Sequence, residues 1–304
     1  FEGFRPGVTE RLGLGPSDCL AVNPKLVYGR VTGWGRNGPL AHTAGHDINF
    51  LALSGALHLI GPAQGKPVPP LNLVGDFGGG GMLLAVGILS ALFDALRTGR
   101  GSVVDAAMLD GIAAQLSMQL RFRAEGCFFD ETGANLLAGA APYYDTYRTS
   151  DGKYVAVGAI EPEFFEILLE KLGIDVERFR AAAFPNLSVE TRTVHWPRLR
   201  AALAERFASR TRDEWAQVFS GSDACVTPVL SLEEAAHHPH NVERGVFVEV
   251  DGVRQNAPAP RFGDPAVAPP HPGVSSGDET EQVLRETGYS MSHIAELRRS
   301  GVIR

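Results

Sequence analysis

Two polar residues in the first third of the chain each lie beside an apolar helical pattern. His46 follows a glycine in "AGHDINFLALSGAL", and Asp76 lies in "VGDFGGGGMLL". A histidine has a reference pKa of about 6.5 and can transfer protons near neutral pH, while a carboxylate can act as base, acid or nucleophile. Both can equally be structural, since aspartate is a favoured N-cap and a lone histidine often only bonds the nearby backbone. The two residues are therefore either caps or two groups of one reaction site.

The glycines after Asp76 and a second carboxylate extend this pattern. Gly78–Gly81 would let another molecule approach the backbone, and the unpaired N–H groups of a helix start would stabilise a developing oxyanion. A phosphate loop is disfavoured, because no Lys-Ser/Thr pair follows and the carboxylate would repel phosphate. Glu161 begins a helix after the strand "YVAVGAI", where it either stabilises the helix dipole or orients a histidine. Asp47 is expected to cap its own helix under either interpretation.

The composition is that of an ordinary soluble globular protein. The chain has 304 residues, of which 44% are hydrophobic and 21% are charged, so it can bury a sizeable core in one large or two medium domains. Lys and Arg together number 28 against 35 Asp and Glu, which gives a formal net charge of −7. Nucleic-acid binding is disfavoured, because neutralising phosphates needs a basic face.

Neither the cysteines nor the histidine cluster indicates a metal site. The run "HHPH" has no second cluster of ligands, so we interpret it as a loop. The cysteines are far apart and lack metal-ligand spacing, as expected for reduced thiols: Cys19, Cys127 and Cys225. We therefore expect a cytoplasmic protein that needs neither disulfides nor a metal.

The apolar runs and the N-terminus bear on the location of the protein. We expect no apolar run of the sequence to be long enough to span a membrane, and no signal peptide. We therefore expect no membrane partner. The first residues, "FEGFRPGVTERLGLG", lack a methionine and read like the middle of a protein. We therefore expect that a further N-terminal segment precedes them.

Strands and helices alternate along the first part of the chain, which predicts an α/β layer. A second α/β unit follows, with the strand "GKYVAVGAI" and a helix that has Pro162 in its first turn. The predicted organisation is a large α/β domain over 1–106, a linker over 107–144, a small α/β domain over 145–232, a Pro-rich linker over 233–280, and a pair of helices over 281–304 that returns to the large domain.

Several motifs together resemble one known family. "AGHDINFLALSGAL", "GDFGGGG", "GSVVDAAMLDG", "PYYDTYRTSDGKYVAVGAIEPEFF" and "HPHNVERG" are similar to family III of the CoA-transferases, and within that superfamily to the α-methylacyl-CoA racemases. The resemblance covers essentially the whole chain. It implies a Rossmann-like large domain that binds CoA, a smaller α/β domain, and an interlocked homodimer in which the two linkers are the threading arms. It also implies that part of the large domain precedes this chain.

The resemblance implies a role for particular residues. His46 and Asp76 would be the two catalytic bases, and Glu161 would pair with the histidine from the other subunit. Arg11 would lie near the CoA phosphates. The remaining substrate or CoA contacts would come from the stretch Gly45 to Phe50 and the glycine run: Gly45, Asp47, Ile48, Asn49, Phe50, Gly78 and Gly79.

The implied chemistry is inversion of a 2-methylacyl-CoA thioester through an enolate, which requires acid/base groups on opposite faces of the α-carbon. No cofactor is expected beyond the CoA of the substrate. The main alternative is a CoA-transferase in which Asp76 attacks the acyl-CoA and forms a mixed anhydride. The pairing of His46 with Glu161 favours the racemase, because the anhydride route needs no opposing histidine. A non-catalytic CoA-binding protein is a third possibility, and branched fatty acyl, bile-acid and arylpropionyl esters all remain open as substrates.

Overall fold

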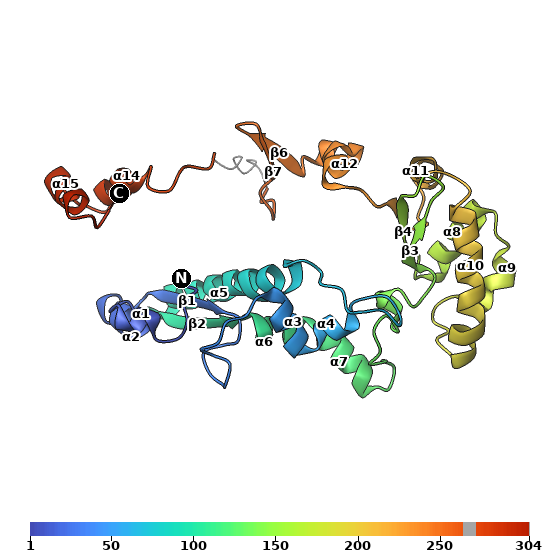
Figure 1. Cartoon of the computed structure of the whole chain (residues 1–304), viewed down its shortest axis with the longest axis horizontal. Coiled ribbons are helices and arrows are strands. Elements are labelled where there is room, and N and C mark those ends of the chain that lie inside the picture. The colour runs from blue at the N-terminus through green and yellow to red at the C-terminus, as the bar shows by residue number, and fades with distance from the viewer. Residues whose placement is uncertain (264–271, 304) are drawn as a thin grey trace. The chain divides into compact units, whose positions relative to one another are not determined.

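The computed structural model describes residues 1–263 and 272–303. The chain divides into two units, Phe1–Val229 and Leu230–Arg304 (Figure 1). Two separate hydrophobic clusters lie within the first unit, one around Phe50 and Ile112 and the other between Ala141 and Ala224. The finer division into a large domain, a small domain and two linkers stays a prediction.

A parallel pair of strands begins the first unit. Strand β1 (Val27–Thr32) pairs with β2 (Ser102–Ala107), and helix α5 (Leu83–Thr98) forms the crossover between them. This connection is the one that parallel strands require. A Cβ at Gly29 of β1 would lie only 2.7 Å from Cδ1 of Ile88, so the glycine lets α5 pack closely on the sheet. The predicted strands and their α/β arrangement are confirmed. The short helices α1 (Val8–Arg11) and α2 (Pro16–Val22) precede β1.

A network of ion pairs ties the N-terminal residues to β1. The guanidinium of Arg30 is buried and contacts Oε1 of Glu2 at 2.6 Å and Oε1 of Glu10 at 2.9 Å. Arg36 also reaches Glu10, at 3.0 Å. The pKa of Glu10 is lowered from 4.5 to about 2, first by a hydrogen bond from its own backbone amide and then by the hydrogen bond and charge of Arg30 and the charge of Arg36, while burial acts in the opposite direction.

This lowered pKa predicts an acid-dependent loss of stability. A carboxylate with a folded-state pKa below its unfolded value stabilises the fold above pH 4.5, and the contribution disappears as the pH falls towards about 2. We expect the thermal unfolding midpoint to fall across this window, and to fall less steeply in Glu10→Gln. Circular dichroism melts at several pH values would measure this. Identical pH profiles for the two proteins would contradict the prediction.

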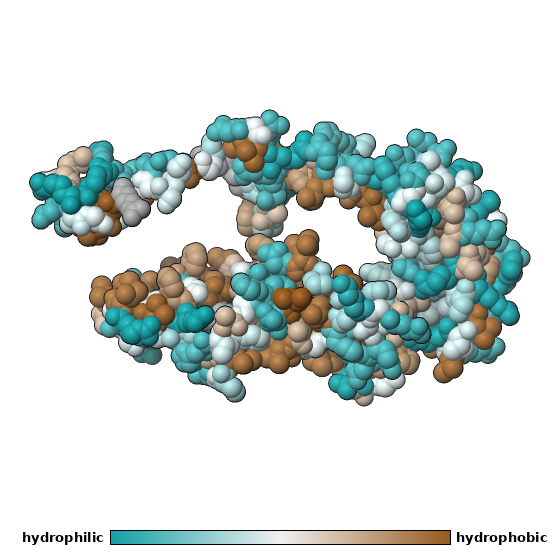
Figure 2. Space-filling view, in the orientation of Figure 1, coloured by the Kyte–Doolittle hydropathy of each residue, from teal (hydrophilic) through white to brown (hydrophobic). Residues whose placement is uncertain are grey.

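The helix that carries Asp76 is longer than the sequence patterns indicate. The π-helix η1 (Leu73–Met82) continues directly into α5, and the combined helix Leu73–Thr98 is long and apolar enough, by length and composition, to cross a membrane. The expectation that no apolar run reaches spanning length is wrong for this segment. One such helix is weak evidence for insertion, because core helices meet the same criteria. Here one face packs on β1 and β2, while Phe93 and Leu96 on α5 are 70% and 87% exposed. Figure 2 shows that hydrophobic residues gather on the surface of the part of the chain that contains α5.

Short helices surround η1 and form the smaller hydrophobic cluster. Phe50, Leu51, Ala56 and Ile112 are its buried members, and η1 contacts two of the three helices that supply them. The elements are α3 (Asp47–Ser54), α4 (Ala56–Leu59), α6 (Met108–Gln115) and α7 (Ser117–Ala124). The helix predicted from Asp47 is confirmed, whereas the beginning of the expected 107–144 linker is helical.

The larger cluster fills a compact α/β body. Its sheet is antiparallel, in the order β3 (Tyr144–Arg148), β4 (Tyr154–Gly158) and β5 (Val226–Pro228). Fully buried aromatic side chains such as Tyr143, Phe165, Phe207 and Trp215 join the sheet to its helices. These are η2 (Leu136–Ala138), α8 (Pro162–Leu172), α9 (Val176–Phe179), η3 (Arg180–Ala182), η4 (Thr191–His195), α10 (Trp196–Phe207) and α11 (Arg212–Phe219). The strand before Glu161 and the helix after it are confirmed.

The second unit contains more regular structure than the sequence suggested. The helix predicted in "SLEEAAHHP" is confirmed, and a capping box between Ser231 and Glu234 starts it. The segment 233–280, predicted to be an extended Pro-rich linker, also contains a second short helix and a hairpin that turns at Asp251-Gly252. Residues 264–271 of that linker lie outside the described residues. The unit's elements are α12 (Leu232–His237), α13 (Pro239–Arg244), β6 (Phe247–Val250), β7 (Val253–Asn256), α14 (Thr280–Glu286) and α15 (Met291–Arg299). The expected C-terminal helix pair is confirmed, and its return to the large domain stays a prediction.

Candidate active site

His46 is the N-cap residue of α3 and its side chain is exposed. Its backbone is extended, with φ −127° and ψ 173°, and its N–H donates to Oδ1 of Asn49 at 3.0 Å. The His46 carbonyl in turn accepts the N–H of Asn49 at 2.8 Å. These bonds fix the start of α3 through the main chain. The position of the imidazole is therefore anchored by its own backbone, and Asn49 is used in that anchoring.

Asp47 joins the two stretches that sequence analysis singled out. Its side chain is buried, and Oδ2 accepts the backbone N–H of Asp76 at 2.7 Å. The prediction that Asp47 caps its own helix is wrong, because His46 occupies the N-cap position and the Asp47 carboxylate points to η1 instead. The residue next to His46 thus holds the backbone of Asp76, and the two candidate bases lie in neighbouring segments.

Asp76 lies inside η1 and does not precede it. The segment begins at Leu73 with Asn72 as its N-cap, because Val74 already packs against the cluster around Phe50. The amides of the glycine run therefore belong to the π-helix and are not the free donors of a helix start. Short π-helical segments are frequent at functional sites.

The glycines of η1 have a packing role. A Cβ at Gly79 would lie 3.0 Å from the amide nitrogen of Ile112 and 3.1 Å from the carbonyl oxygen of Met108, so α6 crosses η1 at this point. Gly78 lies close to the side chain of Gln115, which donates from Nε2 to the carbonyl of Val74 at 3.2 Å. Contact of Gly78 or Gly79 with a substrate stays a prediction.

The other residues of the stretch Gly45 to Phe50 divide into packed and exposed positions. The Phe50 ring is buried and meets Trp34 edge-on, with ring centroids 4.7 Å apart. A Cβ at Gly45 would lie 2.7 Å from Trp34 and 2.8 Å from Phe50, so the bend before His46 requires glycine. Ile48 is 43% exposed and is free to contact a ligand. Trp34 was not predicted as a site residue, and its indole nitrogen is buried with no hydrogen-bond partner among the described residues.

Glu161 is exposed at the N-cap position of α8. Its side chain forms no cap, and no hydrogen bond or ion pair joins it to His46 or Asp76 in the described part of the chain. Burial, followed by the Glu161 carboxylate, raises the pKa of the Cys225 thiol. The pairing of Glu161 with His46 within one chain therefore has no contact to support it.

Arg11 ends α1 and is exposed. Its guanidinium lies against the backbone turn at Gly7, where a Cβ would be 3.3 Å from Nη1. No acidic side chain among the described residues pairs with it. Arg11 can therefore reach an anion such as a phosphate without first breaking an ion pair.

Comparison with known proteins shows which protein family the chain belongs to. The model of CoA-transferase family III matches residues 1–275. The chain belongs to this family. Two family III relatives, the α-methylacyl-CoA racemases of Mus musculus and Homo sapiens, are each 44% identical to it across the whole chain, which spans 78% of their length. The crystal structure of a CAIB/BAIF family protein from Brucella suis is similar, with a TM-score of 0.75 and 26% identity over 94% of this chain and 74% of that one.

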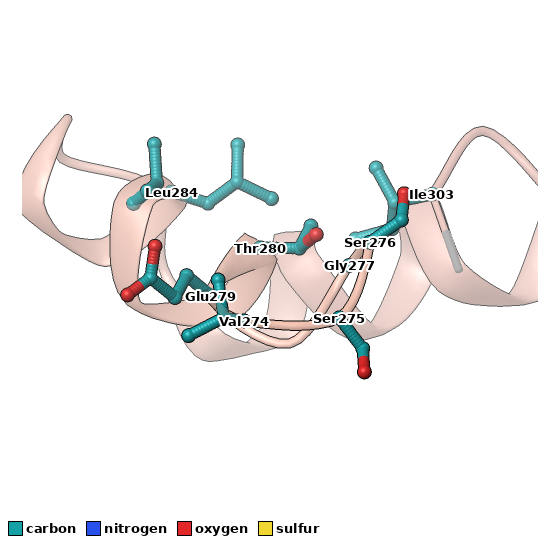
Figure 3. A pocket seen from close by; sticks show the side chains of 9 residues that line it. Val274, Ser275, Ser276, Gly277, Glu279, Thr280, Leu284 and Ile303 are labelled. Atoms are coloured by element: carbon teal, nitrogen blue, oxygen red, sulfur yellow. The ribbon is translucent and has the colours of Figure 1, made fainter. Parts of the chain in front are cut away.

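An open cavity of about 440 Å³ in the Leu230–Arg304 unit contains none of the candidate residues (Figure 3). Its lining includes Val274, Ser276, Glu279, Thr280, Leu284 and Ile303. Across residues 1–263 and 272–303, no group of three His, Cys, Asp or Glu side chains is arranged to hold a metal ion.

Proposed function

We propose that this chain is an α-methylacyl-CoA racemase, an isomerase that interconverts the (R) and (S) forms of 2-methylacyl-CoA thioesters. The observation that carries the proposal is the hydrogen bond from the Asp76 amide to Asp47, which fastens the segment of one candidate base to the residue beside the other. The 44% identity to two racemases over the whole chain supports the same reaction.

The two side chains supply complementary proton transfers. The thioester makes the α-hydrogen weakly acidic, and a neutral His46 removes it from one face while a protonated Asp76 delivers a proton to the other. The reverse reaction exchanges these protonation states. The enolate oxygen needs hydrogen-bond donors, and the amides of Asp47 and Ile48, in the first turn of α3, have no partner within that helix. The chemistry uses no metal or redox cofactor, since CoA is part of the substrate.

A CoA-transferase is the second candidate, because the family takes its name from that activity. In that reaction the Asp76 carboxylate attacks the thioester carbonyl and CoA leaves as the thiolate. The exposed imidazole of His46 has no necessary part in such a step. Its position beside the residue that holds Asp76 therefore favours racemisation.

The two candidates differ in what happens to a single epimer of a 2-methylacyl-CoA. The protein is incubated with one epimer in the presence of a labelled free carboxylic acid, and the configuration of the thioester and the label in the CoA ester are followed by chiral chromatography and mass spectrometry. We expect loss of optical purity without transfer of label. Transfer of label with full retention of configuration would establish the transferase and exclude the racemase.

We also propose an interlocked homodimer in which Glu161 of one subunit orients His46 of the other. Two observations support it: Glu161 has no contact with His46 within the described chain, and α5 exposes large apolar side chains. An exposed apolar face of this kind is typical of an interaction surface. The proposal further places the dimer in the cytoplasm, without a membrane partner.

Subunit mixing tests this arrangement. We expect Glu161→Gln to lower the racemisation rate about tenfold without abolishing it, because an orienting group contributes less than the base itself. A heterodimer of Glu161→Gln and His46→Ala subunits would then contain one fully intact site and recover about half of the wild-type rate. Differently tagged subunits can be co-expressed and purified in tandem. A heterodimer no more active than the Glu161→Gln dimer would contradict the shared site.

A further inference from the structure

The Asp47 carboxylate is a buried charged group with a single hydrogen-bond partner among the described residues. The residue is only 7% exposed, and Oδ2 accepts the Asp76 amide at 2.7 Å. The other oxygen, Oδ1, is buried and has no hydrogen-bond partner in the part of the chain that the structure describes. No cation among those residues forms an ion pair with it. Burying a carboxylate in this way costs stability, so packing alone does not explain an aspartate here.

The surroundings of Asp47 are shaped to admit the carboxylate. Gly75 is buried, and a Cβ there would lie 2.4 Å from Oδ2 and 2.8 Å from Cγ of Asp47. Only glycine permits this approach. The amide that Asp47 accepts belongs to the first turn of η1, whose N–H groups have no acceptor within the helix. A charged acceptor makes such a bond shorter and stronger than a neutral one does.

We propose that Asp47 is a positioning residue for racemisation, which sets the Asp76 carboxyl against the imidazole of His46. It is covalently adjacent to His46 and is hydrogen-bonded to the backbone of Asp76, so it links the two bases directly. This role rests on the proposed racemase function. It assigns no proton transfer to Asp47 itself.

If Asp47 has this role, the rate of inversion should depend on it far more than the rate of α-proton exchange does. Inversion requires both bases to be correctly placed on opposite faces of the α-carbon. Exchange of the α-proton with return to the same face requires only one base. His46 keeps its anchoring to Asn49 when Asp47 is replaced. Loss of the Asp47 bond should therefore displace Asp76 and leave proton removal by His46 largely intact.

The test follows inversion and α-proton exchange in deuterated water for wild type, Asp47→Ala and Asp47→Asn, starting from each epimer. We expect Asp47→Ala to slow inversion about 100-fold, as for a misplacement of about 1 Å, while exchange from the epimer that His46 deprotonates falls less than about threefold. Asp47→Asn keeps an oxygen acceptor for the Asp76 amide and should recover inversion to within about tenfold of wild type. Asp18→Ala, which removes an exposed first-turn aspartate of α2, is the matched control.

Gly75→Ala tests the same link from the other side. Its Cβ must displace the Asp47 carboxylate, so the same selective loss of inversion is expected, including if Asp47→Ala fails to fold. Equal losses of inversion and exchange, no loss in Asp47→Ala, or no recovery in Asp47→Asn would each overturn the role. Wild-type protein that neither inverts nor exchanges either epimer would instead refute the racemase function, which keeps the two failures distinct.

Discussion

His46→Ala and Asp76→Ala each lose racemisation of 2-methylacyl-CoA by about 100-fold to 10,000-fold, the usual contribution of a positioned acid or base. Each variant nevertheless keeps exchange of the α-proton from one epimer only, because the surviving base still serves its own face. The epimer that exchanges is opposite in the two variants. This mirror-image pattern is expected only if the two residues act on opposite faces of one carbon.

The measurement is deuterium incorporation by mass spectrometry, from each pure epimer, combined with chiral analysis of the recovered thioester. His293→Ala is a suitable control, because this ring packs against Tyr289 in α14–α15 and belongs to the other unit. Unchanged racemisation in both variants would show that the assignment is wrong. Loss of exchange from both epimers in both variants would contradict the assignment of one face of the α-carbon to each base.

Gly111→Ala is expected to destabilise the fold and to remove activity together. A Cβ at Gly111 would lie 1.9 Å from the carbonyl oxygen of Gly79 and 2.6 Å from its carbon, so the backbones of α6 and η1 must separate. Overpacking of this kind costs about 1–3 kcal/mol of unfolding free energy. The separation moves the segment that carries Asp76, so kcat should fall more than the stability loss alone would cause.

Gly81→Ala provides the matched control within the same helix. Its Cβ would meet only the Asp76 carbonyl oxygen, at 3.6 Å, which is an ordinary contact. Replacing a helical glycine with alanine in open space gains up to about 1 kcal/mol. Urea unfolding of both variants measures the difference. If Gly111→Ala is as stable as wild type, or if Gly81→Ala is equally destabilised, close packing of η1 on α6 does not explain the glycines.

Local patterns predicted the elements near the site but not the bond that joins them. Helical spacing after His46 and strand alternation before Glu161 are properties of short windows, and both α3 and β4 are present. The side chain of Asp47 acts on a residue of a different helix, so an N-cap rule applied to its own helix assigned it wrongly. The contact forms because Gly75 leaves room for the Asp47 carboxylate, and this is visible only in the folded structure.

The glycine run shows a second limit of sequence patterns. Glycines allow both close ligand approach and close helix packing, and the sequence cannot say which is used. Gly79 meets α6 at Gly111, which lies far along the chain, and η1 begins before Asp76 because Val74 is drawn into the Phe50 cluster. The roles of Glu161 and Arg11 depend on a partner subunit and a ligand, so they stay predictions.

The most direct test of the two-base reaction is the isotopic content of the first inverted product. Wild-type protein is given one epimer of an unlabelled 2-methylacyl-CoA in deuterated water, and both epimers are separated and weighed at low conversion. We predict that the inverted thioester carries one deuterium at the α-carbon while the remaining substrate is still largely unlabelled. Inverted product that retains the original proton, or no inversion at all, would contradict proton delivery by Asp76 to the face opposite His46.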